Sequence, residues 1–452
     1  MSGKTWLIVL GIVAVVSVAL IILGGGDSRV GPSIILISVD TLRPDHLGCY
    51  GYGRDTSPGL DAFAKESLRF ETCFAQAPNT RPSCSSILTG FLPHETKVFS
   101  NKYALPAGVN TAAELLRQHG YKTLAVVSNF VLTGDSGFEQ GFDFYDDQMG
   151  EEELIRGIPE RIAEHTTSAA VSLMRLNRKD GFFMWIHYQD PHGPYTPPPP
   201  YNEMFVDPRL EPVELEANDT VTGVGGIPSY QKLPGYSDYN HYVSQYDGEI
   251  RYLDEHFARL IQALKEMGIY DTALIIFTAD HGEGMGERDY YFAHGEFIYN
   301  NLIRVPLIVK YGSDLKGVSR DAAQTLDIVP TMLDVAGIVP GQGYRGSSLL
   351  GEIPPGRTIF SERPGDYALI QDGLKLIRHT DQPALELYSM EGDPAETINL
   401  ASDAEHASQA KIMAGELERV RKKDRLMGKV RSDQPRISKE RAEKFKALGY
   451  VQ

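Results

Sequence analysis

The stretch SIILISVDT, residues 33–41, decides the fold class of this 452-residue chain. It is an almost continuous apolar run of strand length, and it ends at Asp40. Similar runs lie at residues 123–128, 182–188, 273–279 and 306–310. Strands that are buried on both faces have this composition, and amphipathic helical patterns separate the runs. The sequence therefore predicts an α/β protein in which helices cover a largely parallel sheet.

The N-terminal segment is apolar enough to predict a membrane span. After Lys4, residues 5–26 form an apolar run of about the length that crosses a bilayer as a helix. This predicts an uncleaved transmembrane signal-anchor over residues 1–26, with a cleavable signal peptide as the alternative. Lys4 on the cytoplasmic side would place the rest of the protein outside the cytoplasm, in the periplasm or at the cell surface.

Changes in pattern divide the rest of the chain. The alternation of strands and helices predicts one main domain over residues 33–355. Short runs predict a small antiparallel subdomain over 356–400, and a basic stretch predicts a charged helical tail over 401–452. Residues 247–267 have one apolar stripe at helical spacing and predict a core-packing helix. Residues 211–240 are rich in Gly, Pro, Ser and Asn and predict a surface loop near the substrate entrance.

Charge and cysteine content limit the classes of partner. The formal net charge of −16 argues against nucleic acid, because phosphate backbones bind basic surfaces. A small anionic substrate stays compatible with this charge, since a metal ion or a few local cations can override the global sign. The three cysteines form an odd set, so no disulfide framework is expected.

Polar residues follow the predicted strands where ligands bind in α/β sheets, at the carboxyl ends. Asp40 ends the first strand, Asp280 and His281 follow the run 273–279, and His187, Asp190 and His192 end or follow the run 182–188. Each residue alone is explained by a helix cap or a turn. Several buried charges together require pairing or a metal ion. Carboxylates, an imidazole and a hydroxyl suit a divalent cation, so Asp40, Thr80, Asp280 and His281 are the predicted metal ligands.

Thr80 opens the stretch TRPSCSSILTG, residues 80–90, which predicts a short helix with Pro82 in its first turn. Free backbone N–H groups and the positive end of the helix dipole make this position suitable for a sulfuryl or phosphoryl group. A plain N-terminal cap is the alternative interpretation.

These residues lie in segments that resemble the sulfatase family of the alkaline phosphatase superfamily. The matching segments, in family order, are ISVDTLRPDHLGCYGYGRDTSPGLDAFAKES, APNTRPSCSSILTG, HYQDPHGPYTPP, YDGEIRYLD, TADHGEGMGE, AHGEFIYNNLIRVPLIV, DIVPTMLDVAG and LYSMEGDPAETINL. The resemblance covers residues 33–400 and implies a central mixed, mostly parallel sheet between helices, with a smaller C-terminal sheet. It also implies a metal-dependent hydrolase of anionic esters, with residues 33–355 as the catalytic domain.

The resemblance assigns further residues to roles. It makes Asp40, Asp280 and His281 metal ligands and places Thr80 in the nucleophile position. His192 resembles the histidine that contacts the substrate oxyanion and helps the leaving group depart. His294 stands where many sulfatases place an anion-contacting lysine, so both histidines are expected to be catalytic. Lys97 and Arg43 are weaker candidates for binding the substrate's negative charge.

Three departures from the family pattern bear on the chemistry. Thr41 replaces the second of two consecutive aspartates, and the pair Asp280–His281 replaces Asp–Asn. The added nitrogen favours manganese or zinc, although calcium and magnesium stay open. Cys84 stands where an arginine supports formylglycine, and it is expected to be a packing residue. Because threonine cannot become formylglycine, none is expected, and a metal-bound Thr80 would form a covalent intermediate, with phosphoesters preferred to sulfate esters.

Alternatives stay open for the function. One is a membrane-anchored transferase that passes a phosphoryl-alcohol group from a lipid to a glycan. Another is an inactive protein of the same fold that binds its ligand without reaction. A second metal ion, held by Asp190, His192 and His294, is a further possibility at the site.

Overall fold

The computed structural model describes residues 30–152, 155, 159–179, 181–217, 222–341, 343–382 and 384–423. The predicted signal-anchor at residues 1–26 lies outside these residues, as does most of the predicted tail. Within the described residues, no helix is long and apolar enough to cross a membrane. The anchor therefore stays a prediction from the sequence.

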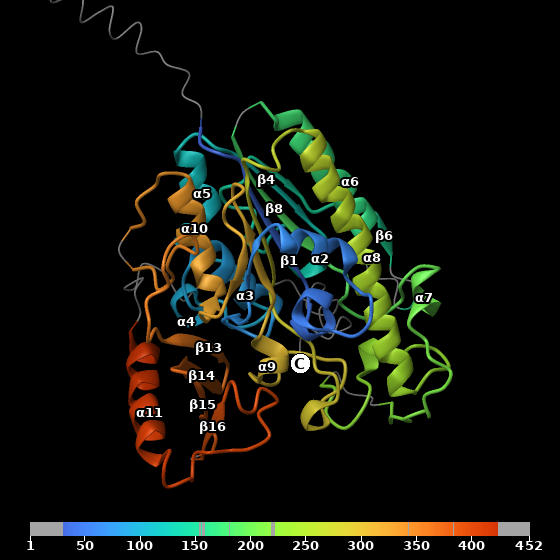
Figure 1. The fold of residues 1–452 in the computed structure, drawn as a ribbon, viewed down its shortest axis with the longest axis vertical. Coiled ribbons are helices and arrows are strands. Elements are labelled where there is room, and N and C mark those ends of the chain that lie inside the picture. The colour runs from blue at the N-terminus through green and yellow to red at the C-terminus, as the bar shows by residue number, and fades with distance from the viewer. Residues whose placement is uncertain are drawn as a thin grey trace, which may run out of the picture.

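A central sheet confirms the fold class (Figure 1). Within the described residues it has eight strands in the order β11-β2-β10-β9-β1-β8-β4-β5. Their bounds are β1 Ile34–Val39, β2 Leu68–Phe70, β4 Lys122–Val127, β5 Phe144–Asp146, β8 Phe182–Tyr188, β9 Leu274–Ala279, β10 Leu307–Lys310 and β11 Gly317–Ser319. Strand β10 runs antiparallel to both neighbours, and the other pairs are parallel. The sheet is thus mixed and mostly parallel.

The register of the three middle strands positions the site. Strand β1 lies between β8 and β9, and all three are buried along their whole length. Val39 pairs with Tyr188 on one side and with Ala279 on the other. The residues after Val39 and Ala279 therefore emerge next to each other at the carboxyl edge, as expected for parallel strands.

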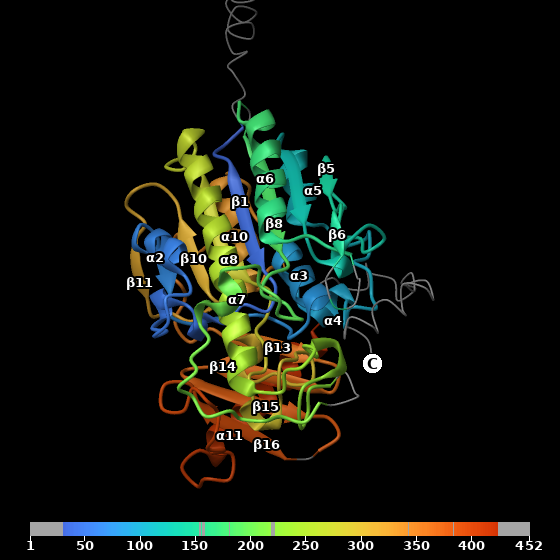
Figure 2. The same cartoon turned by 90° about the vertical axis from the view of Figure 1, so that its right-hand side faces the viewer.

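Helices cover both faces of the sheet (Figures 1 and 2). On one face lie α2 Pro58–Lys65, α6 Ala163–Asn177 and α8 Tyr239–Glu266. On the other lie α3 Thr80–Thr89, α5 Ala112–Gln118 and α10 Ile328–Val335. Shorter elements are β3 Cys73–Phe74, α4 Pro93–Thr96, β6 Glu151–Glu152, β7 Pro159–Glu160, α7 Tyr201–Met204, α9 Asn300–Ile303 and β12 Ala323–Gln324. The molecule is a three-layer α/β structure.

Helix α8 is longer than the apolar stripe predicts. It begins at Tyr239, inside the predicted loop 211–240, and includes the predicted helix 247–267 up to Glu266. Asp238 caps its start, because its side chain accepts from the backbone N–H of Asn240. The first two turns are rich in polar and aromatic residues, so hydrophobic periodicity alone places the start too late. The described residues before it are mostly irregular, with a short 3₁₀ turn at Ser229–Gln231.

A second, antiparallel sheet lies at the C-terminal end of the described chain. It has four strands, β13 Ile359–Arg363, β14 Asp366–Gln371, β15 Leu374–His379 and β16 Leu385–Ser389. Helix α11 Ala407–Lys422 packs on it through Met413 and Leu417. The hydroxyl of Ser361 donates to the carbonyl of Ala75 at 2.6 Å, so β13 rests on the stretch that leads into α3.

A half-buried ion cluster in this small sheet gives a prediction for pH-dependent stability. His379 lies 2.8 Å from Asp366 and 3.3 Å from Glu386, and these contacts raise its pKa to about 10. The stability from His379 is complete below its unfolded pKa of about 6.5 and is lost as the pH rises toward 10. We expect His379→Gln to lower the free energy of unfolding by roughly 2 kcal/mol at pH 6 and much less above pH 10.

Denaturant unfolding of His379→Gln and of wild type at both pH values measures this effect. His119→Gln is the control, because His119 is exposed at the end of α5. An equal loss of stability at the two pH values would show that the charge of His379 does not stabilise the sheet.

Candidate active site

Two buried carboxylates meet at the carboxyl edge of the sheet. Asp40 follows β1 and Asp280 follows β9, and neither side chain is exposed to solvent. The side-chain amide of Asn129 donates to Oδ2 of Asp40. The backbone N–H groups of Thr41 and His281 donate to Oδ1 of Asp280 at 3.3 and 2.7 Å. Burial raises the pKa of both carboxyl groups well above the usual range, and the charge of Asp40 raises that of Asp280 further.

His281 presents a ring nitrogen to both carboxylates. Its Nε2 lies 3.5 Å from Oδ1 of Asp40 and 3.5 Å from Oδ2 of Asp280. Its Nδ1 donates to the carbonyl of Gly282 at 2.9 Å, which leaves the lone pair on Nε2 when the ring is neutral. Burial and the neighbouring His294 lower the pKa of His281 well below its usual value, so the neutral ring is favoured.

These atoms fit a divalent cation. Asp40 Oδ1 and Asp280 Oδ2 are buried and have no hydrogen-bond partner among the described residues. Asp40, Asp280 and His281 each offer a ligand atom within 4.8 Å of the other two. Buried oxygens of this kind are costly unless a cation binds them. The structure thus brings together three of the four predicted metal ligands around one point.

Thr80 begins α3 beside this group. Its Oγ lies 3.4 Å from Nε2 of His281, and its side chain is fully buried. The hydroxyl of Ser83, on the next turn, donates to the carbonyl of Asp280 at 2.6 Å and fixes α3 against the end of β9. Thr80 is in the first turn of the helix, as the sequence predicts. In that turn the backbone N–H of Arg81 donates to Oδ1 of Asn101 at 2.8 Å, and that of Ser83 donates to the carbonyl of Asn79 at 3.0 Å.

The two predicted catalytic histidines lie next to each other. The ring centroids of His192 and His294 are 5.2 Å apart, and those of His294 and His281 are 4.4 Å apart. His192 donates from Nδ1 to the carbonyl of Gly193 at 2.8 Å, which directs Nε2 away from that loop. Burial lowers the pKa of His294 to about 3, so its ring is neutral at neutral pH.

Arg43, predicted to bind substrate, lies within a network of acidic groups. Its guanidinium is 2.7 Å from both Asp45 and Glu287, and it donates to the carbonyl of Glu283 at 2.9 Å. Lys97, the other predicted anion-binding residue, follows α4 and donates to the carbonyl of His94 at 2.7 Å. Both cations thus bind acidic or carbonyl groups of the protein itself, and their role in binding substrate stays a prediction.

Asp190, the only carboxylate among the three possible ligands of a second ion, contacts a side chain of α8. Asp190 is hydrogen-bonded to Glu249 of α8, and the charge of Asp190 adds to burial in raising the pKa of Glu249 well above the usual range. Glu249 also accepts from the backbone N–H of Thr196 at 2.8 Å. The pair therefore ties the loop that carries His192 to α8.

Sequence reasoning missed three supporting residues. Asn129 follows β4 and holds Asp40, and Glu283 lies 3.1 Å from Nδ1 of His294. Tyr195 donates to the other oxygen of Glu283 at 3.1 Å. Burial raises the pKa of Glu283 to about 8. The signal for Glu283 was its position two residues after His281, whereas no local pattern connects Asn129 to Asp40.

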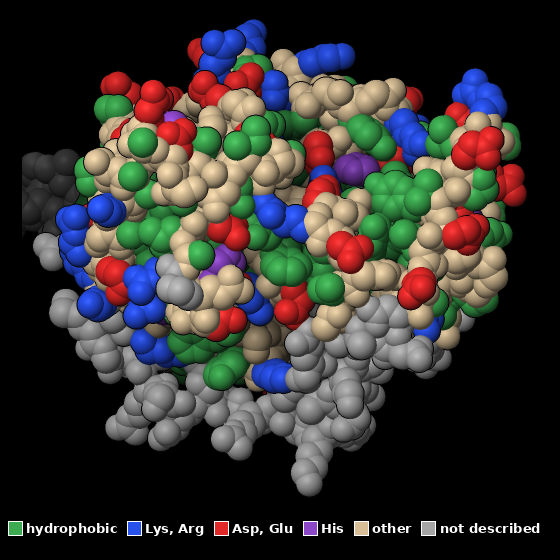
Figure 3. Space-filling model, turned by 90° about the horizontal axis from the view of Figure 1, so that it is seen from below, with side chains coloured by type: hydrophobic (Ala, Val, Ile, Leu, Met, Phe, Trp, Pro, Cys, Tyr) green, Lys and Arg blue, Asp and Glu red, His purple; other side chains and the backbone are tan. Residues whose placement is uncertain are grey.

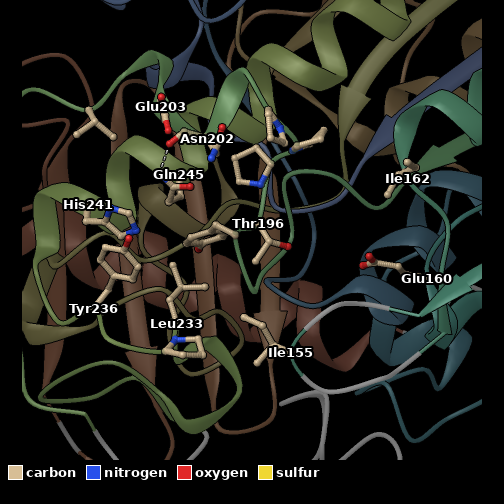
Figure 4. A pocket seen from close by; sticks show the side chains of 16 residues that line it. Ile155, Glu160, Ile162, Thr196, Asn202, Glu203, Leu233, Tyr236, His241 and Gln245 are labelled. Carbon is tan, nitrogen blue, oxygen red and sulfur yellow. Dashed lines mark hydrogen bonds between the residues drawn. The ribbon is translucent and has the colours of Figure 1, made fainter.

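A cleft of about 1220 Å³ reaches the same Tyr195 (Figure 4). Leu233, Pro234 and Tyr236 line it from the segment predicted to be a loop near the substrate entrance. In Figure 4, Tyr236 and His241 stack on one side, while Glu160 and Ile162 lie on the other, with Thr196 between them. Figure 3 shows acidic and basic side chains intermixed over the lower face of the molecule. The cleft therefore opens beside Tyr195, which donates to Glu283.

Comparisons with known proteins agree with this geometry. A family model described as Sulfatase matches residues 32–338. The N-acetylglucosamine-6-O-sulfatase of Bacteroides thetaiotaomicron is 25% identical over 488 positions, which cover 86% of each chain. The structure of BT4656 in complex with its substrate D-glucosamine-2-N,6-O-disulfate superposes with a TM-score of 0.71 at 22% identity, covering 88% of this chain and 98% of that one. The phosphonate monoester hydrolase of Agrobacterium radiobacter gives 0.69 at 22% identity, covering 86% and 95%.

The mixed sheet and the small antiparallel sheet give this chain the fold of these superposed structures. The family match shows that the chain belongs to the sulfatase family, a family of ester hydrolases in the alkaline phosphatase superfamily.

Proposed function

We propose that the protein hydrolyses anionic esters with Thr80 as nucleophile, and that phosphate esters are preferred to sulfate esters. The position of Thr80 carries the proposal: its Oγ lies 3.4 Å from His281 Nε2, beside the buried carboxylates of Asp40 and Asp280. A hydroxyl in the first turn of a helix, next to a metal-ligand cluster, is placed to attack a bound anion. Membership of the sulfatase family supports ester hydrolysis.

The side chain of residue 80 favours phosphorus over sulfur. Threonine cannot become formylglycine, whose hydrate releases sulfate by breaking a carbon–oxygen bond. A Thr80 ester must instead be opened by water at the central atom, a step that is familiar for phosphorus and harder for sulfur. The same fold carries a phosphonate monoester hydrolase. A sulfate ester is the second candidate, because the relative from Bacteroides thetaiotaomicron is named for sulfate on a sugar.

Asp40, Asp280 and His281 would hold the divalent ion. When bound, such an ion lowers the pKa of a nearby hydroxyl and polarises the ester. The imidazole ligand favours manganese or zinc over calcium and magnesium.

Hydrolysis proceeds through two half-reactions, and the residues of the chain have a role in each. In the first, Thr80 Oγ bonds to phosphorus and releases its proton to solvent, while the bond from phosphorus to the alcohol oxygen breaks. His192, with His294 beside it, gives a proton to the departing alkoxide. In the second, water attacks phosphorus and gives one of its protons to Thr80 as the Thr80 oxygen–phosphorus bond breaks, and His192 regains a proton from solvent. The sum converts an ester and water to an alcohol and a free acid.

The predicted membrane anchor favours a transferase as the second candidate function. If residues 1–26 hold the protein at a membrane surface outside the cytoplasm, a lipid would be within reach as phosphoryl-alcohol donor. A glycan hydroxyl would then replace water in the second half-reaction.

A substrate panel tests the proposal. The purified protein is incubated with manganese, zinc, calcium or magnesium and with aryl phosphate monoesters, phosphodiesters, phosphonates and sulfates. We expect turnover of a phosphorus ester with manganese or zinc. Faster turnover of the sulfate would refute the phosphoester preference, and no turnover of any member would favour the inactive binding protein.

The leaving group reveals the role of His192. We expect His192→Ala to lower kcat/KM about 10²–10³-fold for an alkyl phosphate, because its alkoxide must be protonated as it departs. For 4-nitrophenyl phosphate the loss should be less than about 10-fold, since that anion leaves without a proton. Steady-state kinetics on both substrates measure the difference, with His119→Ala as control. Equal losses on both substrates would contradict the role of proton donor.

A further inference from the structure

A second group of ligand atoms lies beside the Asp40–Asp280–His281 cluster. The Sγ of Cys84, a ring nitrogen of His187 and a carboxylate oxygen of Asp280 all lie within 4.8 Å of one another. None of the three residues is exposed to solvent. Asp280 belongs to both groups, so two sites would share one carboxylate.

Regular secondary structure holds this group in place. Cys84 lies four residues after Thr80 on α3, and residues at this spacing share one face of a helix. His187 is in the middle of the buried sheet, on β8, paired with Ser38 of β1. The helix and the sheet thus present sulfur, nitrogen and oxygen to a common point.

The hydrogen bonds of His187 leave one nitrogen for a ligand. Its Nδ1 lies 2.8 Å from the hydroxyl of Ser38, which also accepts from Nε1 of Trp185 at 2.9 Å. Its Nε2 is buried, lies 4.0 Å from Oδ2 of Asp40, and has no hydrogen-bond partner among the described residues. Histidines that bind metals have this arrangement, with one nitrogen held by the protein and the other on the ion.

The charges at the site call for cations. Nε2 of His281 lies 3.5 Å from an oxygen of Asp40 and 3.5 Å from an oxygen of Asp280, and Nε2 of His187 lies 4.0 Å from the other oxygen of Asp40. The donors that contact these carboxylates are neutral, namely the amide of Asn129 and the backbone N–H groups of Thr41 and His281. Neutral donors offset only part of the cost of burying two negative charges. The two imidazoles belong to two separate groups of ligand atoms that share Asp280, so two ions suit the site better than one.

We propose that Cys84, His187 and Asp280 form a second metal site, which takes zinc. A thiolate, an imidazole and a carboxylate are a typical zinc ligand set, and sulfur excludes magnesium and calcium as good occupants. The thiol of Cys84 loses its proton to solvent when the ion binds. The site does not depend on the role of Thr80 in catalysis.

Cobalt titration of the full chain, stripped of metal, tests the proposal without substrate. Thiolate coordination gives cobalt a charge-transfer absorption in the near ultraviolet, which oxygen and nitrogen ligands do not give. We expect two equivalents of bound cobalt and this absorption in the wild type. Cys84→Ser should lose the absorption and one equivalent. Cys73→Ser is the matched control, because Cys73 is equally buried but lies on β3, and it should keep both.

One equivalent in the wild type, or no charge-transfer absorption, would overturn the proposal. Absorption that persists in Cys84→Ser would do the same. If circular dichroism shows that Cys84→Ser does not fold, His187→Gln replaces it and should lose one equivalent with Cys84 intact. A failed substrate panel together with a positive cobalt result would reject the proposed function and leave the second site in place.

Discussion

Thr80→Ala is expected to lower kcat at least about 10⁴-fold on the best phosphorus ester, because it removes the atom that bonds to phosphorus. Metal binding should persist, since Asp40, Asp280 and His281 are unchanged. Thr80→Ser should retain a substantial part of the activity, because serine restores a hydroxyl at the same position. Stopped-flow and steady-state kinetics, with metal analysis of each variant, measure these outcomes.

The control for Thr80→Ala must separate chemistry from folding. Thr80 is buried, so the thermal midpoint of each variant is measured with and without manganese. An alanine variant that binds metal, melts like the wild type and retains full activity would exclude Thr80 as the nucleophile. In that case water near the same cluster would be the attacking group.

Asp280→Asn is expected to have the second large effect, on metal binding. Asn can still accept from the backbone N–H groups of Thr41 and His281 through Oδ1, so the local fold should survive. Loss of the charge should abolish the stabilisation that metal gives to wild type, about 2.7 kcal/mol at 100 times the dissociation constant. Activity should fall at least about 10³-fold, since the residue contacts the predicted ion.

Without metal, Asp280→Asn should not lower the stability of the protein. Burial and the charge of Asp40 raise the pKa of Asp280, so ionised Asp280 is unfavourable without a cation. We therefore expect metal-free Asp280→Asn to melt at the same temperature as metal-free wild type or higher. Differential scanning calorimetry, with chelator and with manganese, measures both states.

Asp327→Asn is the matched control for this experiment. Asp327 is as buried as Asp280, but it pairs with Arg357 at 2.6 Å. Asp327→Asn should lower the melting temperature, because it leaves the charge of Arg357 without its partner. The increase in melting temperature on addition of manganese should be the same as in wild type. If Asp280→Asn behaved like Asp327→Asn, Asp280 would be a structural residue only.

The sequence predicted most of the central sheet because its strands are buried on both faces. Continuous apolar runs mark β1, β4, β8, β9 and β10 within a residue of their observed bounds. The three-residue strands β2, β5 and β11 escaped prediction, because three residues are too few for any periodicity.

The candidate site was predictable where it lies at strand ends. Asp40 and Asp280 are close because their strands are neighbours, and the sequence already placed both at the carboxyl edge. Asn129 was not assigned to the site, and His187 was placed at the carboxyl edge without a role, because only the register of β4, β8 and β1 brings them to Asp40. Cys84 was expected to pack in the core. Cys84 does lie in the core. Its position beside His187 and Asp280 was not predictable, because it depends on how α3 packs on the sheet.

The most direct test of the central claim is the mass of the quenched enzyme. A reaction with a slow phosphorus ester is stopped with acid during turnover, and the chain is digested and sequenced by mass spectrometry. We expect one added phosphoryl group on the peptide that contains Thr80, assigned to Thr80 itself and absent from Thr80→Ala. A turning-over enzyme whose adduct lies on another residue, or that never carries one under conditions where attack outpaces hydrolysis, would contradict this claim.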